Sequence, residues 1–251
     1  MLVVLASLQS CGVTTASLAL AAVWPSARPP AVLVELDPAG GELVSRFSLA
    51  LEPSTLTLAA DLQRGAGDRN RATVLPHAQQ LPGGSLVIPA PIDGAEAEGA
   101  LDVLARALPA ITGIDLIADC GRMDHRRPEG IARLAAAADV VVLVTPPALP
   151  QLLRLQVRLA ELRSSCRPVL LLCGEGPFPA DQVAETLDVP VVGHLPRDVA
   201  AAAMFRGQPS LWCRPRRLPL LRAASPVAAA LCDLQRSPDV DAAPVLAEVS
   251  G

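Results

Sequence analysis

The chain of 251 residues contains no lysine and no tyrosine, and aromatic residues make up only 2% of it. All 21 positions counted as lysine or arginine are therefore arginine. The formal net charge of −4 argues against a protein that coats nucleic acid with its whole surface. Hydrophobic residues account for 51% of the chain, so it can bury a large aliphatic core and does not have the composition of a disordered protein.

Cysteine is scattered rather than clustered. The six cysteines form no CxxC pair and no histidine array lies near them, which favours reduced thiols over a metal site. The apolar start followed by Leu8–Cys11 vaguely resembles a lipoprotein cleavage box, but no basic residue precedes it and it is about half as long as a signal core. No stretch approaches the roughly 20 apolar residues of a membrane span. We therefore expect a cytoplasmic protein with no direct membrane anchor.

Apolar, β-branched runs alternate with longer helical patterns along the chain. Expected strands are Leu2–Ser7, Ala31–Glu35, Ser85–Ile88, Ile114–Asp119, Val140–Thr145, Val169–Leu172 and Val189–Val192. Expected helices are Thr14–Trp24, Ala95–Ala107, Pro128–Ala137, Pro150–Ser164, Ala180–Leu187, Asp198–Arg206 and Leu218–Gln235. The alternation predicts an α/β fold, with a doubly wound, mostly parallel sheet and helices on both faces. We expect a single domain over residues 1–236 and a flexible tail over residues 237–251.

The first expected strand, loop and helix have the layout of a phosphate-binding P-loop. In such a loop the backbone amides and the helix N-terminus hold the phosphates, a lysine reaches the terminal ones, and a Ser or Thr hydroxyl binds magnesium. Here Val13 stands where that lysine belongs, directly before Thr14. The sequence therefore predicts a nucleotide-binding architecture without its principal cation.

Carboxylates follow two of the other expected strands. Glu35 and Asp37 end the second strand, and Asp119 ends the fourth and is followed by Arg122. Ligands bind at the carboxyl ends of the strands in such sheets, and a carboxylate at the end of an apolar strand is costly unless it contacts water, metal or a partner. These residues therefore surround the expected phosphate site.

Four stretches, in order, resemble the ParA/MinD family of deviant Walker ATPases. Residues Leu8–Thr15 match the loop K-G-G-x-G-K-T-T in the final Gly-x-Thr-Thr, without both lysines and both leading glycines. Val32–Gly41 is similar to V-D-x-D-P-x-G-N, and Ile114–Gly121 is similar to the Walker B stretch. Leu187–Asp198 with Gly207–Pro209 looks like the late strand and the adenine-side loop, so the resemblance covers about residues 1–235.

The resemblance implies roles for particular residues. Asp37 would be the catalytic carboxylate that positions the attacking water, and Thr14 and Asp119 would support Mg²⁺. The nucleotide would be bound at Gly12, Val13, Thr14, Thr15, Asp119 and Arg122. ATP or ADP with Mg²⁺ would be the ligand, with no other cofactor. On the base side, Cys173-Gly174 stand where the family commonly has an Asn.

The missing lysines weaken the expected chemistry. Each such cation contributes roughly two to three decades in affinity or rate, so hydrolysis should be very slow or absent, while amides, the helix dipole and Thr14 with Mg²⁺ could still give weak binding. The first hypothesis is a non-standard ParA/MinD-like positioning or scaffold protein with a degenerate nucleotide site. The pilus-localisation branch (TadZ/CpaE-like) is its nearest analogue. It would form a homodimer across the loop face and bind an unknown protein of a positioning or pilus/secretion system.

Other interpretations stay open. In the alternative hypothesis the chain is an active ATPase, in partitioning or in pilus or secretion positioning, with Arg122, Arg126 or Arg127 replacing lysine. General burial statistics favour solvated surface residues for these arginines. An enzyme related to dethiobiotin synthetase is a third reading, although no substrate-pocket signature supports it. The basic segment Arg214–Arg217 could contact DNA, an acidic partner or anionic lipid, or be a solvated face.

Overall fold

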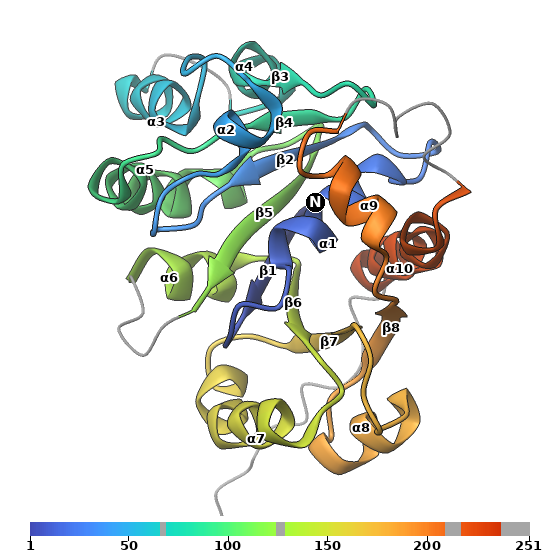
Figure 1. Ribbon diagram of the computed structural model, residues 1–251. Helices are drawn as coiled ribbons and strands as arrows, with labels where there is room; N and C mark the ends of the chain where they lie inside the picture. Colours follow the sequence, from blue (N-terminus) through green and yellow to red (C-terminus); the bar gives the residue numbers. More distant parts are fainter. Residues whose placement is uncertain (66–68, 124–128, 209–216, 237–251) are drawn as a thin grey trace, which may run out of the picture.

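Eight strands pair in a single sheet in the order β3-β4-β2-β5-β1-β6-β7-β8 (Figure 1). The structure is a computed structural model, and it describes residues 1–65, 69–123, 129–208 and 217–236. The strands are β1 Leu2–Ser7, β2 Ala31–Glu35, β3 Gln79–Gln80, β4 Leu86–Ile88, β5 Asp115–Arg122, β6 Val140–Thr145, β7 Pro168–Cys173 and β8 Val191–Leu195. All neighbouring strands are parallel except β3 and β4. The mostly parallel sheet predicted from the sequence is thus confirmed.

Helices cover both faces of this sheet. They are α1 Val13–Ala22, α2 Leu43–Phe47, α3 Thr55–Arg64, α4 Arg71–Val74, α5 Gly94–Ala107, α6 Glu129–Ala137, α7 Leu149–Arg163, α8 Ala180–Leu187, α9 Val199–Met204 and α10 Pro219–Arg236. Successive side chains of a strand point to opposite faces. Leu2, Val4 and Ala6 of β1 therefore pack with α3, α5, α6, α7 and α8, whereas Val3 and Leu5 pack with α1, α9 and α10. The doubly wound arrangement is confirmed by these two cores.

The stretch between β2 and β4 holds the elements that the sequence did not predict. These are α2, α3, α4 and the polar strand β3. Helices as short as α2 and α4 show no helical period, but α3 carries a readable start signal, since the Ser54 amide donates to Thr57 Oγ1 at 3.0 Å. Elsewhere the bounds shift by a few residues. The largest changes lie in β5, which continues to Arg122 instead of ending at Asp119, and in β8, which spans Val191–Leu195 instead of Val189–Val192.

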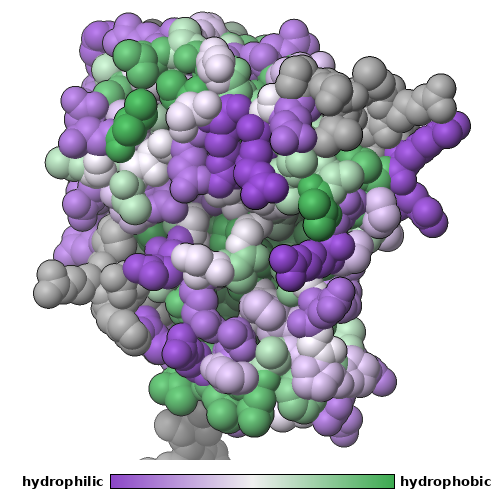
Figure 2. All heavy atoms as spheres, in the orientation of Figure 1, coloured by the Kyte–Doolittle hydropathy of each residue, from purple (hydrophilic) through white to green (hydrophobic). Residues whose placement is uncertain are grey.

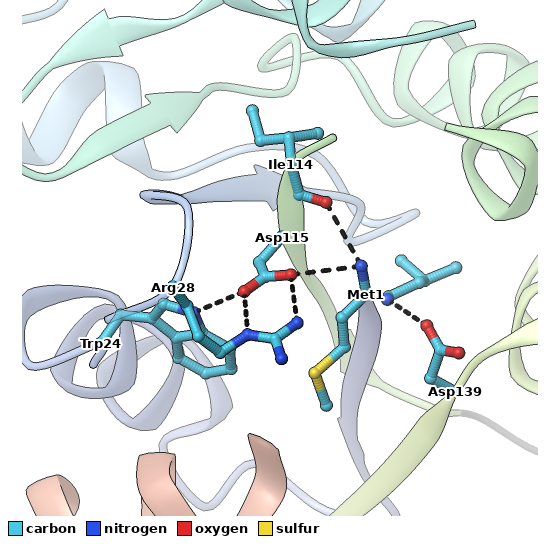
Figure 3. Close-up of polar contacts among 7 residues, drawn as sticks. Met1, Trp24, Arg28, Ile114, Asp115 and Asp139 are labelled. Carbon is cyan, nitrogen blue, oxygen red and sulfur yellow. Dashed lines mark hydrogen bonds and ion pairs between the residues drawn. The ribbon is translucent and has the colours of Figure 1, made fainter. Parts of the chain in front are cut away.

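A buried ionic network holds the end of the sheet opposite the expected phosphate loop (Figure 3). Asp115, at the start of β5, accepts from Arg28 Nε at 2.6 Å and Nη2 at 2.8 Å, and from Trp24 Nε1 at 2.9 Å. The Met1 ammonium lies 3.2 Å from Asp115 Oδ1 and donates to the Ile114 carbonyl at 3.3 Å. Burial raises the pKa of Asp115, but these donors outweigh burial and leave that pKa below its ordinary value. The network ties β1 and β5 to the segment after α1.

Several expectations concern residues outside the described ranges. The tail 237–251, Arg126, Arg127 and residues 213–216 of the basic segment all lie there. Among the described helices, none is long and apolar enough to cross a membrane.

Candidate functional site

The loop between β1 and α1 ends in a glycine with a left-handed backbone. Gly12 has φ 92°, a conformation that glycine adopts at low cost, and it is the N-cap residue of α1. Within the described part of the chain no side chain caps this helix, and no acidic residue lies in its first turn. The first amides of α1 therefore face the end of the sheet without a built-in anionic partner, as in sites that bind phosphate.

The two positions that carry lysine in the ParA/MinD loop are filled by apolar side chains that pack inward. Val13 is 5% exposed and belongs to the core between the sheet and α1. Leu8 is partly buried and packs against the opposite core. Neither position offers a charge to a ligand at the loop.

The expected site residues meet at a pocket of about 170 Å³ beside this loop. Its lining comprises Ser7, Ser10, Cys11, Gly12, Val13, Thr14, Thr15, Glu35, Asp37, Gly40, Glu42, Arg46, Gly121 and Arg122. The structure thus brings together six of the seven predicted site residues, Gly12, Val13, Thr14, Thr15, Asp37 and Arg122. The seventh, Asp119, is fully buried and close enough for Thr14 and Asp37 to influence its pKa.

Asp119 is a buried carboxylate with incomplete hydrogen bonding. Its Oδ1 accepts from the Gly121 amide at 3.1 Å, whereas its Oδ2 has no partner at hydrogen-bond geometry within the described part of the chain. Burial raises the pKa of Asp119 to about 6, although the nearby Thr14 hydroxyl and the Gly121 amide act in the opposite direction. A carboxylate and a hydroxyl with room for water suit Mg²⁺, which keeps several waters when bound. The residues present therefore fit the ion that the loop implies.

An irregularity in β5 shapes this corner of the pocket. Leu5 of β1 pairs with Asp119 and Ser7 pairs with Arg122, so the β5 residues between them form a bulge. Gly121 within the bulge has φ 57°. The bulge explains why the strand continues past Asp119, and it places Arg122, which is exposed, on the pocket rim.

Asp37 enters the pocket from the loop after β2. Its Oδ1 accepts from the Ala39 amide at 2.9 Å, which fixes the turn. Burial raises the pKa of Asp37, while the Ala39 amide and the charge of Arg122 oppose this rise. The backbone of the turn after β2 therefore holds the Asp37 side chain in the pocket beside the β1–α1 loop.

Glu35, by contrast, is bound by the protein backbone. Its Oε1 accepts from the amides of Glu42 at 2.7 Å and Leu43 at 3.2 Å, and its Oε2 accepts from the Ala90 amide at 2.9 Å. Burial raises its pKa to about 7 despite these bonds. Glu35 thus fastens the start of α2 and the segment after β4 to the end of β2.

Two charged residues of the pocket were not considered in the sequence analysis. Arg46 and Glu42 line the pocket from α2 and its N-cap, and they form an ion pair. An i,i+4 pair of opposite charge was the available signal, but it carries weight only once a helix is recognised there.

A larger hollow of about 780 Å³ lies on the other side of the loop. It is lined by Leu8, Gln9, Ser10, Arg122, Met123, Arg154, Val157 and Arg158. Arg154 donates to Gln9 Oε1 at 3.0 Å and so links α7 to the loop. In Figure 2 polar side chains (purple) surround a hollow near the middle of the view, and a separate apolar patch (green) lies at the lower edge of the molecule, over α7. On this helix Leu149, Leu153 and Val157 are exposed.

Comparison with known proteins identifies the fold. No protein-family model and no curated protein matches the sequence. In structure the chain is similar to the cell division ATPase MinD of Pyrococcus furiosus, with 18% identity, TM-score 0.66, and 92% of this chain and 98% of that one covered. A ParA family ATPase of Chlorobium tepidum TLS has 17% sequence identity and a TM-score of 0.67, with 91% of this chain and 97% of that chain covered. The septum site-determining protein MinD of Pyrococcus horikoshii OT3, complexed with Mg-ADP, has 15% identity and a TM-score of 0.67, with 91% of this chain and 95% of that chain covered.

These likenesses define the architecture of the chain. A parallel sheet with a glycine-ended loop between its first strand and first helix is a P-loop type of α/β fold. More particularly, the chain has the fold of the MinD and ParA ATPases.

Proposed function

We propose that this chain is a ParA/MinD-like positioning or scaffold protein with a degenerate nucleotide site, which binds Mg-nucleotide weakly and hydrolyses ATP very slowly or not at all. One observation carries the proposal. The loop, Asp37 and Asp119 are brought together as a nucleotide site requires, yet Val13 is buried in the core at the position of the lysine.

The residues present could hold a nucleotide without that lysine. The amides at Gly12–Thr15 would bind phosphate oxygens, and Thr14 and Asp119 would hold Mg²⁺ directly or through water. Asp37 would orient a water molecule near the terminal phosphate. The Mg-ADP bound to the P. horikoshii neighbour supports this class of ligand.

Hydrolysis would suffer most from the missing charges. Catalysis of phosphoryl transfer consists largely of positioning and of stabilising the charge on the transferred group. Loss of both lysines would remove roughly two to three decades each if the measured effect of single charge-assisted contacts applies. A protein of this kind would act through its surfaces and its nucleotide occupancy rather than through turnover.

We propose that the protein forms a homodimer through the face that carries the β1–α1 loop. Leu8, Val157, Arg122, Arg154 and Arg158 line the larger hollow, so apolar and arginine contacts are available there in place of a lysine that crosses to the partner. We propose that the protein is cytoplasmic and that residues 1–236 form a single domain. An unknown protein of a positioning or pilus/secretion system is its proposed partner. The assignment to the TadZ/CpaE-like branch rests on resemblance alone.

Calorimetric titration of the purified protein with ATP and with ADP, each with Mg²⁺, tests the nucleotide site. We expect saturable binding between micromolar and millimolar nucleotide. Thr14→Val keeps the shape of the side chain but removes the hydroxyl, so it should weaken binding by about tenfold or more. If no heat of binding is found up to millimolar nucleotide, the nucleotide part of the proposal fails and only the scaffold role stays.

The competing proposal is an active ATPase in which arginine replaces lysine. Arg122 is exposed on the pocket rim, and its charge reaches Asp37, which favours it among the arginines first considered. Under this proposal, Arg122→Ala would abolish a measurable turnover. An unchanged rate in Arg122→Ala would remove Arg122 from this role.

A further inference from the structure

We propose that Arg46, on α2, binds the terminal phosphates of the nucleotide and so supplies the charge that Val13 cannot. This inference rests on the proposed nucleotide site and deepens it. Its position in the sequence, 33 residues beyond the loop lysine position, gives no hint of the role, which becomes visible only because α2 folds against the pocket.

The backbone of Arg46 is held firmly at the pocket rim. The amides of Glu42 and Leu43, at the start of α2, donate to Glu35 Oε1, so the helix is anchored to the end of β2. On the other side Gly207 packs against α2 so closely that a Cβ there would lie 1.9 Å from the Arg46 carbonyl oxygen. Anchored from both sides, α2 can present a side chain to the pocket without reorganising.

Arg46 lies at the pocket in which the other site residues meet. It lines this pocket together with Gly12, Thr14 and Asp37. Phosphates held by the α1 amides and by Mg²⁺ at Thr14 and Asp119 would lie within the same small volume. Arginine suits such a ligand because its planar guanidinium can donate two parallel hydrogen bonds to phosphate oxygens.

The present partner of Arg46 can be displaced. Arg46 Nη2 is ion-paired with Glu42 Oε2 on the next turn, and the Glu42 side chain is 63% exposed. Exposed pairs of this kind contribute little to stability, so phosphate oxygens can replace the Glu42 carboxylate at small cost. Glu42 would then compete with the ligand, and its neutralisation should strengthen binding.

The test is calorimetric titration of four variants with Mg-ATP and with inorganic tripolyphosphate plus Mg²⁺. Arg46→Ala should weaken both ligands by at least about tenfold, Arg46→Lys should give an intermediate affinity, and Glu42→Gln should strengthen both ligands by about twofold or more. Arg106→Ala removes an exposed arginine of α5 that does not line the pocket, so it should leave both affinities unchanged. Tripolyphosphate lacks the base and the ribose, so a variant that weakens the binding of both ligands acts on phosphate binding and not on binding of the base.

The outcomes separate this inference from the proposal beneath it. If the wild type binds neither ligand at millimolar concentration, the nucleotide site and the role of Arg46 fall together. If the wild type binds but Arg46→Ala stays within twofold of it, only the role of Arg46 is overturned. If Arg46→Ala does not fold, Glu42→Gln decides the question. A Glu42→Gln variant that binds Mg-ATP no more tightly than the wild type would contradict the proposed competition between Glu42 and phosphate for Arg46.

Discussion

Asp37 packs directly against Gly121, and a Cβ added to Gly121 would lie 1.9 Å from Asp37 Oδ2 and 2.4 Å from its Cγ. Gly121 also has φ 57°, where an L-residue is strained. The turn after β2 and the bulge in β5 are therefore fitted to each other. Two motifs separated along the chain by the whole of α2, α3, α4 and α5 form one rigid corner of the pocket.

Gly121→Ala should disturb this corner. The added methyl group must displace Asp37 or move the bulge, and the backbone conformation is unfavourable for alanine, so we expect a loss of roughly 1–3 kcal/mol in the free energy of unfolding. Urea unfolding measures it. Gly99→Ala is the matched control, since nothing lies within 4 Å of a Cβ at that position in α5 and alanine favours a helix. Equal stability of Gly121→Ala and the wild type would refute the close fit.

Asp119→Asn should stabilise the protein at neutral and higher pH. The pKa of Asp119 is raised to about 6 from 3.8 by burial, so the protonated form is favoured in the folded state. The contribution of the Asp119 proton to the free energy of unfolding is fully present below about pH 4 and is lost as the pH rises through about 6. The loss amounts to roughly 3 kcal/mol at most. The variant has no such loss, and we expect it to be about 1–3 kcal/mol more stable than the wild type at pH 8.

Urea unfolding of Asp119→Asn and the wild type across pH 4–8 checks this sign. Glu35, whose pKa burial raises to about 7, makes both proteins less stable as the pH rises from about 4.5 to 7. The charge of Asp119 adds to that rise, so the difference between the two proteins reports Asp119 together with its effect on Glu35. Millimolar Mg²⁺ should stabilise the wild type by mass action and leave Asp119→Asn unchanged. If Asp119→Asn loses as much stability between pH 4 and pH 8 as the wild type does, the raised pKa does not belong to Asp119.

Asp115→Ala should be strongly destabilising. It removes a carboxylate that is 3% exposed and leaves Arg28 and the Met1 ammonium without their shared partner. Breaking such a buried pair costs about 3–5 kcal/mol. Because the pKa of Asp115 lies below its ordinary value, its contribution is present above about pH 4 and is lost at lower pH.

An exposed ion pair provides the comparison for Asp115. Arg64 pairs with Asp61, and its side chain is 68% exposed. Arg64→Ala should change the free energy of unfolding by less than about 1 kcal/mol. Thermal or urea unfolding that shows the two variants to be equally stable would mean that the buried network contributes no more than a surface pair.

The strands of the central sheet were predictable because their apolar runs are long and β-branched. The bounds of β1, β2 and β6 match the prediction to the residue. The order of the motifs also indicated which segments would meet at one edge of the sheet. Hydrophobic periodicity could not reveal α2, which has five residues, and Arg46 was therefore not considered.

The environment of each carboxylate depended on contacts that no local pattern encodes. Glu35 and Asp119 both read as carboxylates at strand ends. In the structure Glu35 accepts from three backbone amides, two at the start of α2 and one in the segment after β4, whereas Asp119 keeps an oxygen without a hydrogen-bond partner among the described residues. The difference arises from a bulge and from distant loops, and it is what separates a structural carboxylate from a candidate magnesium ligand.

Phosphate release from Mg-ATP, measured with the purified wild type and with Asp37→Ala, tests the central claim most directly. Asp37→Ala removes the carboxylate proposed to orient the water while leaving the loop intact, so it also reports any contaminating ATPase. The account predicts that the two proteins release phosphate at the same rate within error, at the level of the background. A wild-type rate that Asp37→Ala lowers tenfold or more would show a working ATPase and contradict the degenerate site.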